Sequence, residues 1–277
     1  IIPLNQNYIV MKRIIQLSLI LAVAILFSCT AKKSESPFSV PFEKYKLDNG
    51  LTVILHEDKS DPIVAVAIAF HVGSSREVPG KTGFAHLFEH MMFQRSENVG
   101  EDQLFRLIQG AGGELNGGTS FDYTVYYEVV PRNALEMALW LESDRMNSLN
   151  ITEENLENKK SVVLEEKKQV FDNAPYGNMF NDVFRNLFPG SGYEHSVIGT
   201  VQDITSFSVE GAMNFHRNFY SPSNSVLVIT GDINYGITEN LVRKYFDGLR
   251  TNYEISRRPN VIAPVENSIV EDHYDNI

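Results

Sequence analysis

Hydrophobic positions follow two different patterns along this chain, and each pattern predicts a different element. Residues 45–47 and 51–55 are short apolar-polar stretches on either side of Asn49-Gly50, a pair that readily takes the positive φ angles of a tight turn. Residues 63–70 are apolar without interruption, which predicts a central strand covered on both faces. Residues 225–230 and the second half of 114–130 are rich in β-branched and aromatic side chains, and we predict strands there as well.

Segments between these strands show helical spacing and helical start signals. Pro131 is suited to a first helical position, and Thr152 is suited to an N-cap ahead of acidic residues. We predict helices at 101–109, from 131, from 152, at 176–187, from 209 and at 237–249. The fold class is therefore α+β, a mainly antiparallel sheet of about five to six strands packed against helices, in one domain over residues 43–255.

The amino-terminal region has the pattern of an export signal. Lys12-Arg13 precede a run at 14–27 that is apolar except at two positions, and this run is short for a membrane span. Residues 26–29 resemble a bacterial lipobox, so residues 1–28 are interpreted as a signal region and Cys29 as a lipid-modified residue. A plain membrane anchor and an ordinary cleaved signal are the alternatives. An over-extended reading frame would account for residues 1–10, which precede Met11.

Cysteine content and net charge limit the cellular compartment and the classes of partner that we expect for this protein. Cys29 is the only cysteine, so no internal disulfide can form, and lipid modification would remove an otherwise reactive thiol. Residues 29–42 are rich in serine and proline and are predicted to be a tether. We expect a bacterial periplasmic protein anchored by lipid to a membrane, in our interpretation the outer membrane. The net charge of −11 argues against nucleic-acid binding.

The chemistry centres on His86, Glu89 and His90 in the segment 83–93. On a helix these three residues share one face, because each residue turns the helix by about 100°. Two imidazoles one turn apart can hold a zinc ion, and a carboxylate that is not a ligand can accept a proton from water. The alternative is a buried helix whose histidines have only a structural role.

A zinc site needs a third protein ligand, which spacing alone does not identify. The candidates are His195, His216 and many acidic residues, including those of the glutamate-rich segment 153–166. Most acidic residues in such a helix are solvated. All of these candidates remain open at this level.

The His-x-x-Glu-His order resembles the inverted zinc motif of the pitrilysin, insulin-degrading enzyme and mitochondrial processing peptidase family, the inverzincins. In that family the third ligand is a glutamate about 76 residues beyond the second histidine, after a Val-Val-Leu-Glu-like run. Glu166 lies 76 residues after His90 and ends such a run at 162–166, with Glu165 as its competing neighbour. The resemblance implies Zn²⁺ bound by His86, His90 and Glu166, with Glu89 as the general base.

The likeness extends over residues 43–255. Residues 112–126 resemble the family's substrate strand, which implies that Asn116, Thr119 and Ser120 hold an extended peptide by backbone pairing. From the residues alone, an ordinary bulged edge strand is the simpler interpretation of this stretch. The later segments 198–200, 220–224 and 231–232 also resemble family landmarks.

Two departures qualify the resemblance. Lys159 occupies a position where the family usually has an acidic residue, which puts support of the metal site in question. Family enzymes also enclose substrate between two halves, and residues 256–277 are interpreted as a linker or the start of a missing second domain. The expected function is a zinc-dependent endopeptidase acting on peptides or small unfolded proteins. The alternatives are a partner-dependent or non-catalytic subunit, paired with a second half or a homologous subunit, and a lipid-anchored binding protein.

Overall fold

The computed structural model describes residues 39–252 and 268–272. The predictions for the signal region 1–28, for Cys29 and for most of the tether and the 256–277 linker fall outside the described residues and stay predictions. Within the described residues, no helix combines the length and apolar character that crossing a membrane requires.

The centre of the domain is a six-stranded sheet with strand order β1-β2-β6-β3-β5-β4. Strands β2 and β6 pair in parallel, and every other neighbouring pair is antiparallel. The strands are β1 (Glu43–Lys46), β2 (Thr52–Glu57), β3 (Ile63–Phe70), β4 (Glu114–Thr119), β5 (Thr124–Pro131) and β6 (Ser225–Gly231). The α+β class and the mainly antiparallel sheet are confirmed.

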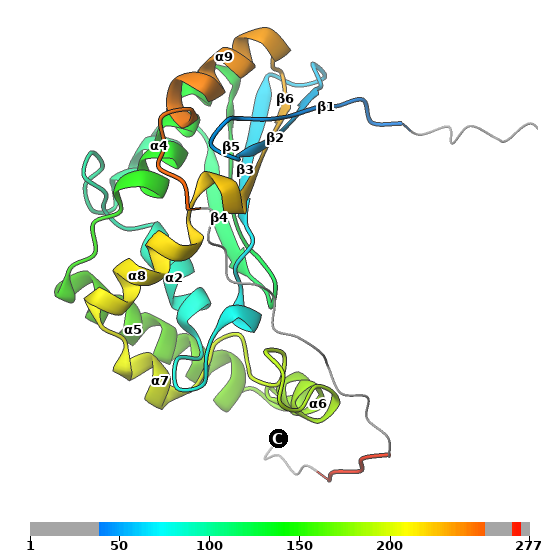
Figure 1. Ribbon diagram of the computed structural model, residues 1–277, viewed down its shortest axis with the longest axis vertical. Helices are drawn as coiled ribbons and strands as arrows, with labels where there is room; N and C mark the ends of the chain where they lie inside the picture. The colour runs from blue at the N-terminus through cyan, green and yellow to red at the C-terminus, as the bar shows by residue number, and fades with distance from the viewer. Residues whose placement is uncertain (1–38, 253–267, 273–277) are drawn as a thin grey trace, which may run out of the picture. The chain divides into compact units, whose positions relative to one another are not determined.

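Helices pack against the sheet and against one another, as Figure 1 shows for α4 and α9 beside its upper part. The α-helices are α2 (Phe84–Met92), α3 (Gln103–Gly110), α4 (Leu135–Ser148), α5 (Glu153–Lys167), α6 (Met179–Leu187), α7 (Val201–Ser206), α8 (Val209–Phe219) and α9 (Tyr235–Phe246). Helix α7 was not predicted, because six residues are too few to show a helical period. The strand predicted in the second half of 114–130 is β5, and the glycine-rich first half forms β4, which pairs with it through a turn.

Strand β3 lies between β6 and β5, as a central strand should, but it is fully buried on one face only. Val64, Val66 and Ile68 are completely buried on that face. The alternating residues Ala65, Ala67 and Ala69 are only half-buried. The prediction of two covered faces was therefore wrong for the described structure, because small alanines continue the apolar run without being enclosed.

The amino terminus of helix α5 is capped by side-chain hydrogen bonds. The Thr152 side chain accepts a hydrogen bond from the Asn155 amide, and the Asn155 side chain accepts one from the Thr152 amide. This reciprocal capping satisfies two amides that a helix start otherwise leaves unpaired. The predicted N-cap is confirmed, and α5 packs directly against α2. That contact brings two distant parts of the sequence together.

Candidate metal centre

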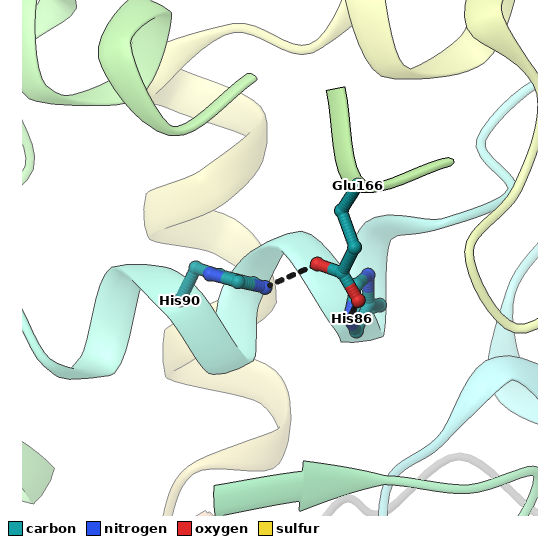
Figure 2. Close-up of side chains that lie close together, drawn as sticks. All are labelled: His86, His90 and Glu166. Atoms are coloured by element: carbon teal, nitrogen blue, oxygen red, sulfur yellow. Dashed lines mark ion pairs between the residues drawn. The ribbon is translucent and has the colours of Figure 1, made fainter. Parts of the chain in front are cut away.

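His86, His90 and Glu166 converge at the contact between α2 and α5. Glu166 Oε1 lies 3.6 Å from His86 Nε2, and Glu166 Oε2 lies 3.3 Å from His90 Nε2. Figure 2 shows both imidazoles on one face of α2 with the carboxylate reaching toward them from the neighbouring helix. Their side chains are 13%, 25% and 38% exposed, so the cluster is sheltered but open to small molecules.

These distances fit a tetrahedral zinc site. Two ligand atoms about 2.0–2.1 Å from one tetrahedral zinc ion lie roughly 3.3 Å apart. The two observed nitrogen–oxygen separations of 3.3 and 3.6 Å are close to that value, and one donor atom from each residue lies within 4.8 Å of the others. A pair of imidazole nitrogens with one carboxylate oxygen is also a donor set that zinc prefers.

The protonation states of His86 and Glu166 also favour metal binding. Burial lowers the pKa of His86 to about 4, so its imidazole is neutral at pH 7. The hydrogen bond from His90 lowers the pKa of Glu166, which is therefore a carboxylate. Neutral imidazole and ionised carboxylate are the forms that coordinate a metal. His86 Nδ1 is buried without a hydrogen-bond partner in the described structure, so packing and the Glu166 contact hold this ring.

The structure places the other histidine candidates elsewhere. His195 Nδ1 lies 3.7 Å from Glu77 Oε2 at the start of α2. His216 is buried, and its Nε2 lies 3.3 Å from the backbone oxygen of Arg145. Neither joins the cluster of possible ligands found among the described residues. The choice of Glu166, which spacing could not make, agrees with this geometry.

Glu89 lies on α2 beside the cluster and is held by Thr119 of strand β4. Thr119 Oγ1 donates to Glu89 Oε2 at 2.6 Å. Burial raises the pKa of Glu89, while the hydrogen bond from Thr119 lowers it. A carboxylate has about four lone-pair sites on its two oxygens, so Glu89 can accept a proton while it holds the hydrogen bond from Thr119. Sequence reasoning assigned Thr119 to substrate, but its hydroxyl points to the predicted base.

For the peptide cleavage that the family resemblance implies, replacing Thr119 by valine is expected to lower kcat by about tenfold or more, because a hydrogen bond to a charged group is worth roughly 1.5–3 kcal/mol. Thr119→Ser should keep most of the activity, since serine retains the hydroxyl. KM should change little in both variants. Steady-state kinetics with a fluorogenic peptide measures this, and equal losses for valine and serine would contradict the assigned contact.

Strand β4 occupies the edge of the described sheet, as predicted for a strand that accepts a peptide. Asn116 pairs with Tyr127, and Thr119 pairs with Thr124, so their side chains lie on opposite faces of the strand. The Ser120 amide donates to the Tyr123 carbonyl, and the Ser120 carbonyl accepts from Ser74. Ser120 is therefore engaged in the turn, and the open edge consists of Glu114–Thr119.

One residue that binds the first amides of α2 was missed by sequence reasoning. The Glu77 carboxylate accepts hydrogen bonds from the Gly83 and Ala85 amides. The N-cap position of α2 is Gly83, which has no side chain to cap the helix. That absence is the signal that could have directed attention to an upstream acidic residue.

An α+β domain that joins an inverted His-x-x-Glu-His helix to a distant glutamate defines a metallopeptidase-type fold. The family model described as "Insulinase (Peptidase family M16)" matches residues 52–201, and the chain belongs to this family. A second model, described as "Peptidase M16 inactive domain", matches residues 206–276. The family expected from the motif is thereby confirmed.

Curated relatives and solved structures agree with this assignment. The chain is 30% identical to zinc protease PqqE of Helicobacter pylori, over 86% of this chain and 53% of the relative. It is 26% identical to the probable mitochondrial-processing peptidase subunit beta of Schizosaccharomyces pombe, over 76% and 46%. The crystal structure of a protease from Helicobacter pylori superposes with a TM-score of 0.75 at 30% identity, covering 80% of this chain and 54% of that one.

A further structural match supports the fold alone. The first half of the periplasmic protease PqqL from Escherichia coli gives a TM-score of 0.73 at 20% identity, covering 81% of this chain and 49% of that chain. The chain thus spans about half the length of the relatives that it matches. The activity of a whole family member is consequently a proposal for this chain.

Proposed function

We propose that this chain is the metal-binding part of a zinc-dependent endopeptidase that hydrolyses peptides or small unfolded proteins. The observation that carries the proposal is the convergence of His86, His90 and Glu166 with Glu89 beside them on α2. The names of the relatives, several of which are zinc proteases, support the same metal and reaction class.

His86, His90 and Glu166 would hold the zinc ion, and zinc would supply Lewis-acid activation of water and of the peptide carbonyl. Glu89 accepts the proton of the attacking water and then delivers it to the leaving amine. Thr119 keeps the Glu89 carboxylate oriented throughout. The edge of β4, which contains Asn116, pairs with the peptide backbone. This pairing places the scissile bond beside α2.

A second candidate is a subunit that needs a partner or is not catalytic. One observation in its favour is that the chain spans about half the length of its relatives. A second is that one relative, at 25% identity, is by its name a subunit of a larger assembly, the bovine cytochrome b-c1 complex subunit 1. Cleavage measured with and without a co-expressed carboxyl-terminal half separates the two functions. Activity that appears only with the added half identifies a partner-dependent chain.

Zinc binding tests the site directly, and the ligand helix offers a matched control. Glu166→Gln should lower zinc affinity by at least about tenfold, because an anionic ligand is lost. Glu165→Gln should leave zinc affinity unchanged, since the Glu165 carboxylate instead accepts a hydrogen bond from Gln169. Competition with a chromogenic chelator measures both values. Equal zinc affinity in the parent and in Glu166→Gln would overturn the proposed ligand set.

A further inference from the structure

Glu77 is a buried carboxylate placed against the first turn of the metal-site helix. Its Oε2 accepts from the Gly83 amide at 2.9 Å, and its Oε1 accepts from the Ala85 amide at 2.7 Å. Its side chain is 0% exposed. Two of the amides that open α2 are therefore bound by a residue outside the helix, and His86 follows Ala85 directly.

No residue at the N-cap position could replace this interaction locally. Gly83 has φ +86°, in the left-handed region, and a Cβ atom there would lie 2.4 Å from the Ile198 carbonyl oxygen. A serine, threonine or aspartate cap is thus excluded by close contact with the segment that precedes α7. The fold instead brings a carboxylate from six residues upstream to the open end of the helix.

The Glu77 carboxylate also lies near a third segment. His195 Nδ1 lies 3.7 Å from Glu77 Oε2, in the loop between α6 and α7. The neighbouring residue Thr82 is held by a different carboxylate, Asp203, which accepts from the Thr82 amide at 2.9 Å. Only Glu77 of these two acids binds the amides of Gly83 and Ala85.

We propose that Glu77 is a positioning residue for metal binding, whose carboxylate holds the first turn of α2 and thereby the imidazole of His86. A rigid first turn keeps His86 Nε2 facing Glu166 before any metal arrives, and a ligand held in place in this way binds a metal more tightly. This inference rests on the proposed zinc site, but the helix-capping role of Glu77 can be measured without zinc.

The test compares Glu77→Met, which removes both acceptors, with Glu77→Gln, which keeps one. In the full chain, Glu77→Met should raise the zinc dissociation constant by about 2–30-fold, the factor that corresponds to the loss of a helix cap, and Glu77→Gln should raise it less. In metal-free protein, the amides of residues 83–87 should exchange hydrogen faster in the same order. Asp203→Asn is the matched control, because it weakens the same loop without releasing the amides of α2.

The outcomes separate this inference from the proposed function. If the parent chain does not bind zinc, the proposed function fails, and the exchange rates still show whether Glu77 holds the helix. If Glu77→Met or, should that variant not fold, Glu77→Gln binds zinc as the parent does with unchanged exchange in α2, the positioning role is overturned. A loss of affinity in Asp203→Asn as large as in the Glu77 variants would also overturn it, by showing general destabilisation of the loop.

Discussion

Replacing Glu89 by glutamine is expected to lower kcat for peptide cleavage by roughly 10²–10⁴-fold, the usual contribution of a positioned general base. Glutamine has nearly the same shape, and its amide oxygen can still accept the 2.6 Å hydrogen bond from Thr119. It cannot take a proton from water. Zinc content and KM should therefore stay close to the parent values while kcat falls.

The measurement is cleavage of a fluorogenic peptide by the parent and by Glu89→Gln, each assayed alone and with a co-expressed carboxyl-terminal half. Glu165→Gln is the control, since it removes a carboxylate from the surface of α5 and should cleave normally. Parent-like cleavage by Glu89→Gln would remove the base role. Loss of zinc together with activity would instead make Glu89 part of the metal-binding set.

The second large effect is on stability, through Arg145 in the core. Arg145 Nη2 donates to Glu128 Oε1 at 3.1 Å, and Arg145 Nε donates to Glu142 Oε2 at 3.0 Å. Its guanidinium carbon also lies 4.6 Å from the centre of the Tyr126 ring. Arg145→Met leaves two carboxyl groups buried without a cation, and we expect a loss of about 3–5 kcal/mol in the free energy of unfolding.

The same variant should show a specific pH dependence. Burial already raises the pKa of Glu128 well above its ordinary value, with the neighbouring Glu142 as a further cause. Without Arg145, which lowers that pKa, it rises further. A raised folded-state pKa gives stability that is present below the unfolded value near 4.3 and lost as pH rises. The deficit of Arg145→Met relative to the parent should therefore grow as pH rises through the raised pKa of the parent's Glu128, and be smaller at about pH 5 than at about pH 9.

Urea unfolding at both pH values measures these differences. Arg132→Met is the control, because Arg132 pairs with Asp232 at 2.9 Å but is 63% exposed, and such pairs contribute at most about 1 kcal/mol. Adding Glu128→Leu and Glu142→Leu to Arg145→Met should recover part of the loss, since the unpaired acids are then removed. A deficit no larger than that of Arg132→Met would contradict the account of this cluster.

Local features were predictable because they depend on neighbours in the chain. The turn at Asn49-Gly50 joins β1 and β2, and Thr152 begins α5 as expected. The burial of each strand face was not predictable in the same way, because it depends on contacts with segments far away in the chain. Alanines at positions 65, 67 and 69 continue an apolar run, yet only the packing shows that one face of β3 is fully enclosed.

The sequence by itself determined most of the longer elements and the helix that presents His86, Glu89 and His90 on one face, because a helical period depends on residues a few positions apart. The spacing of residues left the third ligand among several acids and histidines, and only the family resemblance singled out Glu166. Tertiary structure decided that Glu166 meets both imidazoles and that Thr119 binds Glu89, and the folded loop before α2 decided that Glu77, six residues before Gly83, caps the helix. The Glu166 and Thr119 contacts join segments far apart in the chain, and only the packing of α5 and β4 around α2 brings these side chains within bonding distance.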